Sequence, residues 1–190
     1  MEAAPRRERA DAARNRDLIL AAAGRLLAEG DPQRVTMEDI ARAAGVGRGT
    51  LYRRYPDRAS IARALLDDHE KALQERMLRG RAPLGPDGEA TPAERLAAFY
   101  DAMLTLLERH GHLALGAETG ADRYATGAYG FWRAHVRALA VAADAADPDV
   151  LADTLLAPLA PELYLARRAR GTSRRRIAAD LHRLASALLG

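Results

Sequence analysis

The apolar residues of this chain are mostly of the kinds that favour helices over sheets. The 190 residues include 43 Ala and 27 Leu but only five Val and four Ile. Ala and Leu are among the strongest helix formers, whereas the β-branched residues that strands prefer are scarce. With 48% hydrophobic residues, the chain can also build a packed core. The sequence therefore predicts an all-α fold.

The chain contains no cysteine, which excludes disulfides, thiolate nucleophiles and cysteine-based metal centres. Its apolar runs are far shorter than the roughly 20 residues that span a bilayer. The arginine-rich N-terminus lacks the apolar segment of a signal peptide. We therefore expect a cytoplasmic protein with no membrane partner. No spacing of residues suggests a metal or another cofactor.

Positive charge is concentrated in the N-terminal part of the chain. Residues 1–79 carry 16 basic and 13 acidic side chains, whereas residues 80–190 carry 13 of each. The densest positive stretch within the predicted helices, residues 42–58, holds five Arg and one acid, Asp57. A short cationic segment of this kind is either a solvated surface or a contact for an anionic partner such as nucleic acid.

Apolar periodicity, capping residues and helix breakers define the expected helices. Residues 1–13 lack a clear apolar stripe, so they are expected to form a flexible arm or a frayed helix start. In that arm Arg6, Arg7 and Arg9 are either disordered or add contacts to DNA. The predicted helices cover residues 14–29, 37–44, 48–55, 57–77, 91–109, 121–145, 148–170 with a bend near Pro158 and Pro161, and 173–189.

Residues 36–55 have the pattern of a helix-turn-helix. Thr36 and Asp39 form an approximate capping box at the start of the first short helix. Gly45 ends that helix in a turn, and Val46 pins the two helices together. In the second helix Leu51 faces inward, and Pro56 ends the helix. Proteins present a helix to the DNA major groove with this arrangement.

The Gly- and Pro-rich stretch 80–88 is the expected domain boundary. We therefore divide the chain into a flexible basic arm (1–13), a three-helix helix-turn-helix DNA-binding domain (14–55), a connecting helix (56–78) and a second helical domain (79–190).

The run TMEDIARAAGVGRGTLYRRYPDRASI, residues 36–61, closely resembles the DNA-binding signature of TetR-family transcriptional regulators. The resemblance covers roughly residues 14–65. It implies a homodimer whose N-terminal domains bind a pseudo-palindromic operator in double-stranded DNA. It also implies a C-terminal domain with a dimer interface and a pocket for a small apolar or amphipathic ligand that releases the repressor.

Carried onto matching positions, the resemblance assigns DNA contacts to Thr36, Arg48, Gly49, Thr50, Tyr52, Arg53, Arg54 and Arg58. Thr36, Tyr52 and Arg58 would hold phosphates, and Arg48 and Arg54 are candidates for bidentate reading of guanine. Tyr55, beside Pro56, is expected in the core. Two positions depart from the family pattern: Gly47 replaces a hydroxyl-bearing helix cap, and Glu38 places a carboxylate that would repel phosphates unless it reads cytosine or stabilises the helix start.

Leucines recur at helical spacing in the last two predicted helices and suit a four-helix dimer interface across a two-fold axis. The alternative is that they fill the domain's own core. The expected interface residues are Leu151, Leu155, Leu159, Leu163, Ile177, Leu181, Leu184 and Leu188.

Aromatic residues gather after residue 98 and could line an apolar effector pocket, although core packing is an alternative for each one. The expected pocket residues are Tyr100, Met103, Leu104, Leu107, Phe131, Trp132 and His135, the last as a polar contact. His110 and His112 flank Gly111 and are expected to cap the end of a helix rather than bind a metal.

Two further functions remain open from the residues alone. One is a DNA-binding protein that acts constitutively, without an effector. The other is an all-α enzyme that pairs Asp101 or Glu108 with His110, although no nucleophile motif or phosphate loop accompanies them.

Overall fold

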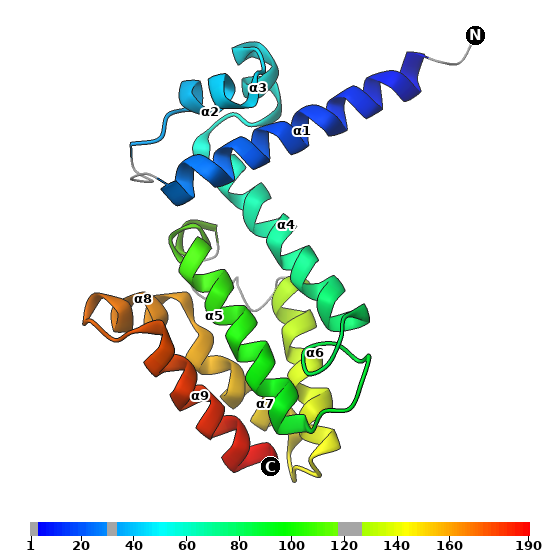
Figure 1. Cartoon of the computed structure of the whole chain (residues 1–190), viewed down its shortest axis with the longest axis vertical. Coiled ribbons are helices and arrows are strands. Elements are labelled where there is room, and N and C mark those ends of the chain that lie inside the picture. Colours follow the sequence, from blue (N-terminus) through cyan, green and yellow to red (C-terminus); the bar gives the residue numbers. More distant parts are fainter. Residues whose placement is uncertain (1–3, 30–33, 118–126) are drawn as a thin grey trace. The chain divides into compact units, whose positions relative to one another are not determined.

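The computed structural model describes residues 4–29, 34–117 and 127–190, and it describes side chains over 11–27, 34–110 and 127–190. The described residues form α-helices joined by turns and one short 3-10 segment, which confirms the all-α prediction (Figure 1). None of the described helices combines the length and apolar character that a membrane crossing requires. The chain divides into two compact units, Met1–Asp67 and Asp68–Gly190.

The N-terminal unit consists of α1 (Ala4–Glu29), α2 (Met37–Ala44), α3 (Arg48–Arg54) and the first part of α4 (Arg58–Arg79). Its core takes one apolar face from each helix, with Ile19, Ile40, Leu51 and Ile61 each at most 1% exposed. Tyr55 is 7% exposed and lies in this core, as predicted. Leu18 of α1 lies outside this core and is 44% exposed.

Helix α1 begins ten residues earlier than the expected start at residue 14. Of the two expectations for residues 1–13, the flexible arm is therefore wrong for residues 4–13, whose backbone is helical, and the helix start agrees with the structure there. Ala10, Ala12 and Ala13 are strong helix formers, so this segment extends the helix without needing a buried face. The side chains of Arg6, Arg7 and Arg9 lie outside the described residues.

The C-terminal unit adds α5 (Pro92–Ala117), α6 (Gly127–Ala142), α7 (Pro148–Leu156), α8 (Pro161–Ala169) and α9 (Arg174–Leu189) to the end of α4. Helix α5 is central and packs against α6, α8 and α9 (Figure 1). The predicted break near Pro158 and Pro161 is confirmed, since a 3-10 turn (Ala157–Leu159) separates α7 from α8. Helix α5, however, continues eight residues past its predicted end at Arg109.

The division between the units falls at Asp67, within α4, and not in the stretch 80–88 as predicted. That stretch is a folded loop: Ala82 N donates to Asp87 O at 2.7 Å and Asp87 N donates to Gly80 O at 3.1 Å. The Arg95 guanidinium donates to the carbonyls of Gly85 and Gly88 at 2.6 and 3.1 Å. Because the loop is fixed by these bonds, its glycines and prolines do not mark a linker.

The prediction of a leucine dimer interface needs correction. Leu155, Leu159, Ile177 and Leu181 are at most 6% exposed and belong to the core of the C-terminal unit. The helical spacing was right, but these side chains cover α5 instead of the outer surface. Only Leu188, at 43%, is exposed, while three others are half-buried: Leu151, Leu163 and Leu184.

We expect Gly45→Ala to destabilise the N-terminal unit by about 1–2 kcal/mol. Gly45 has φ 65°, and a residue with a Cβ is less stable than glycine by about this free energy in the left-handed conformation. No atom lies within 4 Å of the added Cβ, so the cost would come from the backbone alone. Chemical denaturation followed by circular dichroism measures the change. Gly24→Ala in α1 is the control and should not destabilise. Equal losses in both variants would contradict the backbone argument.

Candidate functional site

Helix α2 begins with a reciprocal cap. The Thr36 hydroxyl accepts from Asp39 N at 3.2 Å, and Thr36 N donates to Asp39 Oδ2 at 3.1 Å. The Thr36 hydroxyl also donates to Asp39 Oδ2 at 2.6 Å, and these bonds lower the pKa of Asp39 below its usual value. The predicted capping box is therefore present, and Thr36 stands exposed at the start of the helix.

The turn between α2 and α3 has the expected form. Gly45 ends α2 in the left-handed conformation, and its N–H donates to Arg42 O at 3.2 Å. Val46 N donates to Ala41 O at 3.1 Å, and the Val46 side chain packs against the core. Gly47 starts α3 without a side-chain cap, so Thr50 N and Leu51 N bond to its carbonyl alone. The chain thus forms a helix-turn-helix.

Helix α3 presents one apolar and one polar face. Leu51 is fully buried against α1 and α2 core residues, which fixes the rotation of the helix. The opposite side exposes Arg48, Gly49, Tyr52, Arg53 and Arg54, with Thr50 half-buried. A Cβ on Gly49 would meet no atom within 4 Å, so nothing within the described protein requires glycine there. Each predicted DNA-contacting residue of α3 is therefore at least partly accessible in the free protein.

Glu38 contacts two of these residues, which sequence reasoning missed. Its Oε1 lies 3.7 Å from Arg48 Nη1 and accepts from the Tyr52 hydroxyl at 3.4 Å. Arg54 Nη1 donates to the carbonyl of Ala12 in α1 at 2.5 Å. Arg48 and Arg54, the predicted guanine readers, thus each have a partner in the free protein. Reading DNA with these guanidiniums would require exchanging those partners for bases or phosphates.

The predicted pocket residues in the C-terminal unit also need correction. Tyr100, Met103, Leu104, Leu107 and Trp132 are at most 8% exposed and belong to the core, with Phe131 packed at its edge. The Tyr100 hydroxyl donates to Leu155 O at 2.9 Å, and burial raises the pKa of Tyr100. His135 lies 5.4 Å from Phe99 between ring centroids. None of these residues lines the cavity between α4 and α5.

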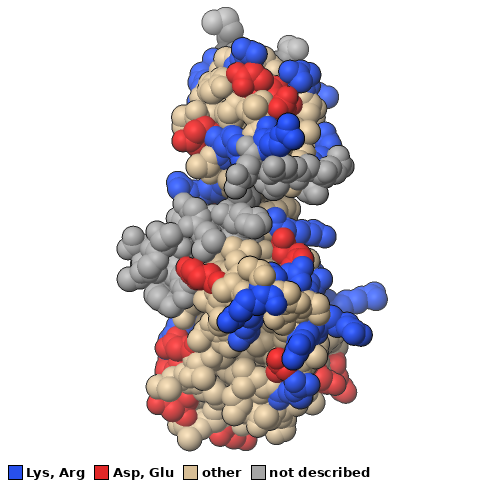
Figure 2. Space-filling view, turned by 90° about the vertical axis from the view of Figure 1, so that its left-hand side faces the viewer, with Lys and Arg blue, Asp and Glu red and all other residues tan. Residues whose placement is uncertain are grey.

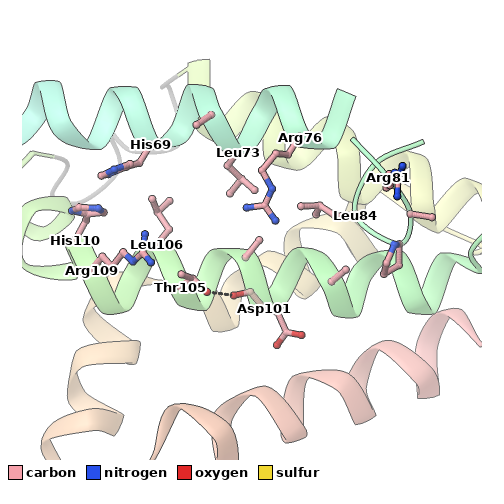
Figure 3. A pocket seen from close by; sticks show the side chains of 15 residues that line it. His69, Leu73, Arg76, Arg81, Leu84, Asp101, Thr105, Leu106, Arg109 and His110 are labelled. Carbon is pink, nitrogen blue, oxygen red and sulfur yellow. Dashed lines mark hydrogen bonds between the residues drawn. The ribbon is translucent and has the colours of Figure 1, made fainter. Parts of the chain in front are cut away.

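That cavity has a volume of about 520 Å³ and lies between the end of α4, the loop after it and the face of α5 that is turned toward α4 (Figure 3). Arg76 extends from α4 toward α5, and His69 and His110 face each other across the same gap. Its polar lining residues are His69, Arg76, Arg81, Asp101, Thr105, Arg109 and His110. The sequence carried a signal for them, since His69, Leu73 and Arg76 recur at helical spacing on α4, but their mixed polarity resembles a solvated face.

His69 and His110 stack with ring centroids 4.3 Å apart and planes inclined by 26°. Burial lowers the pKa of both rings, and that of His110 falls to about 4 because His69 and Arg109 also lie near it. The prediction that His110 caps a helix end is wrong, because α5 continues past it. His112 lies outside the residues whose side chains are described.

The postulated acid–base pairs with His110 are not formed. Glu108 accepts from Arg168 and Tyr164 in α8, and Asp101 pairs with His182 in α9 at 3.0 Å. His110 Nε2 is buried without a hydrogen-bond partner in the described part of the chain.

Comparisons with known proteins agree with the helix-turn-helix geometry. A family model described as bacterial regulatory proteins of the tetR family matches residues 19–65. An uncharacterised helix-turn-helix transcriptional regulator of Mycobacterium bovis is 34% identical over 100 residues, which are 50% of this chain and 50% of that protein. A helix-turn-helix regulator of Staphylococcus aureus is 40% identical over 68 residues, 35% of this chain and 36% of its own length. The chain thus spans about half the length of the mycobacterial relative.

Two crystal structures share the fold over nearly the whole chain. A protein of Rhodococcus sp. described as a TetR-family regulator superposes with TM-score 0.64 at 18% identity, covering 94% of this chain and 100% of its own. A second, from Syntrophomonas wolfei, gives TM-score 0.63 at 16% identity, covering 92% and 94%. At these identities the likeness establishes the fold and not the ligand.

We expect Glu38→Gln to increase affinity for every DNA duplex and to steepen the salt dependence of binding by about one unit, because Arg48 would lose its carboxylate partner and become available to phosphates. Fluorescence anisotropy across a salt series measures both quantities. Glu75→Gln, which removes an exposed carboxylate paired with Arg79 in the other unit, is the matched control. Unchanged affinity and slope in Glu38→Gln would show that this ion pair does not limit binding.

Proposed function

We propose that the chain is a TetR-family regulator, a homodimeric repressor released from a pseudo-palindromic operator by a small molecule, which the match to the family model and the shared fold support. The observation that carries the DNA-binding role is the exposed cationic surface of α3, held outward by the buried Leu51. A short helix fixed in this way can enter the major groove while α2 crosses the backbone.

The proposed DNA contacts of the helix-turn-helix are of two kinds, contacts to base edges and contacts to phosphates. Arg48 and Arg54 would read base edges after leaving Glu38 and Ala12. Thr36 at the start of α2, Tyr52, and Arg58 at the start of α4 would hold phosphates. Gly49 would let the backbone of α3 approach the DNA closely.

A dimer is needed because one helix-turn-helix contacts too little DNA, whereas two placed about 34–36 Å apart engage successive major grooves. After the correction above, the apolar side chains left for an interface on α8 and α9 are Leu163, Leu184 and Leu188. Small neighbours such as Ala179 and Ala187 are exposed on α9 and would permit close helix contact.

The cavity favours effector control over constitutive binding. Its lining includes residues of α4, the helix that also contributes Ile61 and Leu65 to the N-terminal core. A ligand that shifts α4 would therefore change the position of the DNA-binding helices. Couplings of this kind are typically about 1–3 kcal/mol.

We expect Arg48→Ala to lose about 1–3 kcal/mol of discrimination between the operator and mismatched sites, since one bidentate base contact would be removed. Arg58→Ala should instead weaken binding to all sequences and lower the salt slope by about one unit. Selection of operators from a random duplex library, followed by anisotropy titrations, measures both. A monomeric protein with equal, weak affinity for every duplex would overturn the proposal.

We expect Gly49→Ala to stabilise the fold by about 0.5–1 kcal/mol while weakening DNA binding, because alanine suits a helix but its methyl group would stand between α3 and DNA. Thermal unfolding and operator titration test the two effects separately. Gly130→Ala, equally open but on α6, should stabilise without affecting DNA. Unaltered operator affinity in Gly49→Ala would remove Gly49 from the interface.

A further inference from the structure

The cavity between α4 and α5 carries unbalanced positive charge. Three arginines line it, Arg76 from α4, Arg81 from the following loop and Arg109 from α5. Within the described residues, no carboxylate forms an ion pair with any of them. Elsewhere in the same unit, by contrast, Arg133, Arg137 and Arg168 are paired with Asp149, Asp153 or Glu108.

The one acidic residue of the lining does not cancel this charge. Asp101 lies on α5, but its Oδ1 is 3.0 Å from His182 Nε2 on α9. Figure 3 shows its carboxylate directed away from the gap between α4 and α5. The excess is local, because basic and acidic side chains are interspersed over the face of this unit seen in Figure 2.

The inner wall of the cavity is apolar. Leu73 and Leu84 are at most 8% exposed, and Leu106 completes the wall together with small alanines of α5, Ala98 and Ala102. The arginines, in contrast, are exposed at its opening. An occupant would therefore meet cationic groups at one part of its surface and hydrocarbon at another.

Two buried ring nitrogens in the lining lack partners. His69 Nδ1 and His110 Nε2 form no hydrogen bond in the described part of the chain, although His110 is only 8% exposed. Buried polar atoms in folded proteins are nearly always hydrogen-bonded. Both rings are uncharged near neutral pH, because burial depresses their pKa values. They would thus offer a polar contact to an occupant without adding further charge.

We propose that this cavity binds an amphipathic anion, with its acidic group held by Arg76, Arg81 and Arg109 and its hydrocarbon part lying on the leucine and alanine wall. A guanidinium group can donate paired N–H hydrogen bonds to a carboxylate or to a phosphate, because both anions fit the same donor geometry. The volume of about 520 Å³ suits a small organic molecule. The statement that this anion is the effector rests on the proposed function. Binding of the anion to the cavity can itself be tested without DNA.

The test is isothermal titration calorimetry of the full chain with four probes that share one alkyl tail: decanoate, decyl phosphate, decanol and decyltrimethylammonium, each below its micelle concentration. Decanoate, decyl phosphate or both should bind at least about tenfold more tightly than decanol, since charged hydrogen bonds are added. The cationic probe should not bind. Preference between the two anions identifies carboxylate or phosphate as the headgroup.

The double variant Arg76→Gln with Arg109→Gln should lose about tenfold in affinity for the anionic probes and keep its affinity for decanol. Arg79→Gln, on the same helix but outside the lining, is the matched control and should bind like the parent protein. Circular dichroism verifies that the variants fold. Equal binding of decanol and the anions, or no loss in the double variant, would overturn the proposal.

Operator titrations on the same preparations separate this inference from the proposed function. Operator binding without any binding of the anionic probes would refute the ligand assignment and leave the DNA-binding role intact. Anion binding with no selective DNA binding would refute the proposed regulatory function and support the ligand class proposed for the cavity.

Discussion

Helix α4 takes part in two separate hydrophobic cores, and the structure depends on this. Ile61 and Leu65, near its start, are buried with α1, α2 and α3 residues in the N-terminal unit. About two turns further along the helix, Leu73 and Met77 are buried in the core of the C-terminal unit. One helix therefore contributes residues both to the core behind the helix-turn-helix and to the lining of the cavity.

In the proposed complex with DNA, the electrostatics of the N-terminal unit would favour selectivity over raw affinity. Glu38 contacts Arg48 and Tyr52, and the Ala12 carbonyl accepts from Arg54, so these side chains would exchange those partners for DNA groups. A phosphate alone would compensate poorly for the loss of the Arg48–Glu38 ion pair, because the Glu38 carboxylate would remain beside it. A base edge that accepts both donors of Arg48 compensates better, so the carboxylate raises the difference between correct and incorrect sites.

Local features of the chain were predictable because a few adjacent residues decide them. The cap at Thr36, the left-handed turn at Gly45 and the end of α3 before Pro56 each follow from one side chain and its own backbone. What covers an apolar face was not predictable. Leu155 and Leu181 have the spacing of an interface and also of a core, and only the position of α5 decides between them. Gly111 likewise resembled a helix end, although α5 continues past it to Ala117.

The same ambiguity applies to the aromatic residues expected to line a pocket. Aromatic side chains such as Tyr100 and Trp132 supply large apolar areas, and the C-terminal unit uses them to fill its interior. The face of α5 toward α4 carries Ala98, Ala102 and Thr105, which are too small to fill the gap between the helices. Space remains there, and arginines from both sides border it. If an anion bridges Arg76 and Arg109, it joins α4 to α5 by attraction where two cations otherwise repel each other. Ligand binding would then draw the end of α4 toward α5.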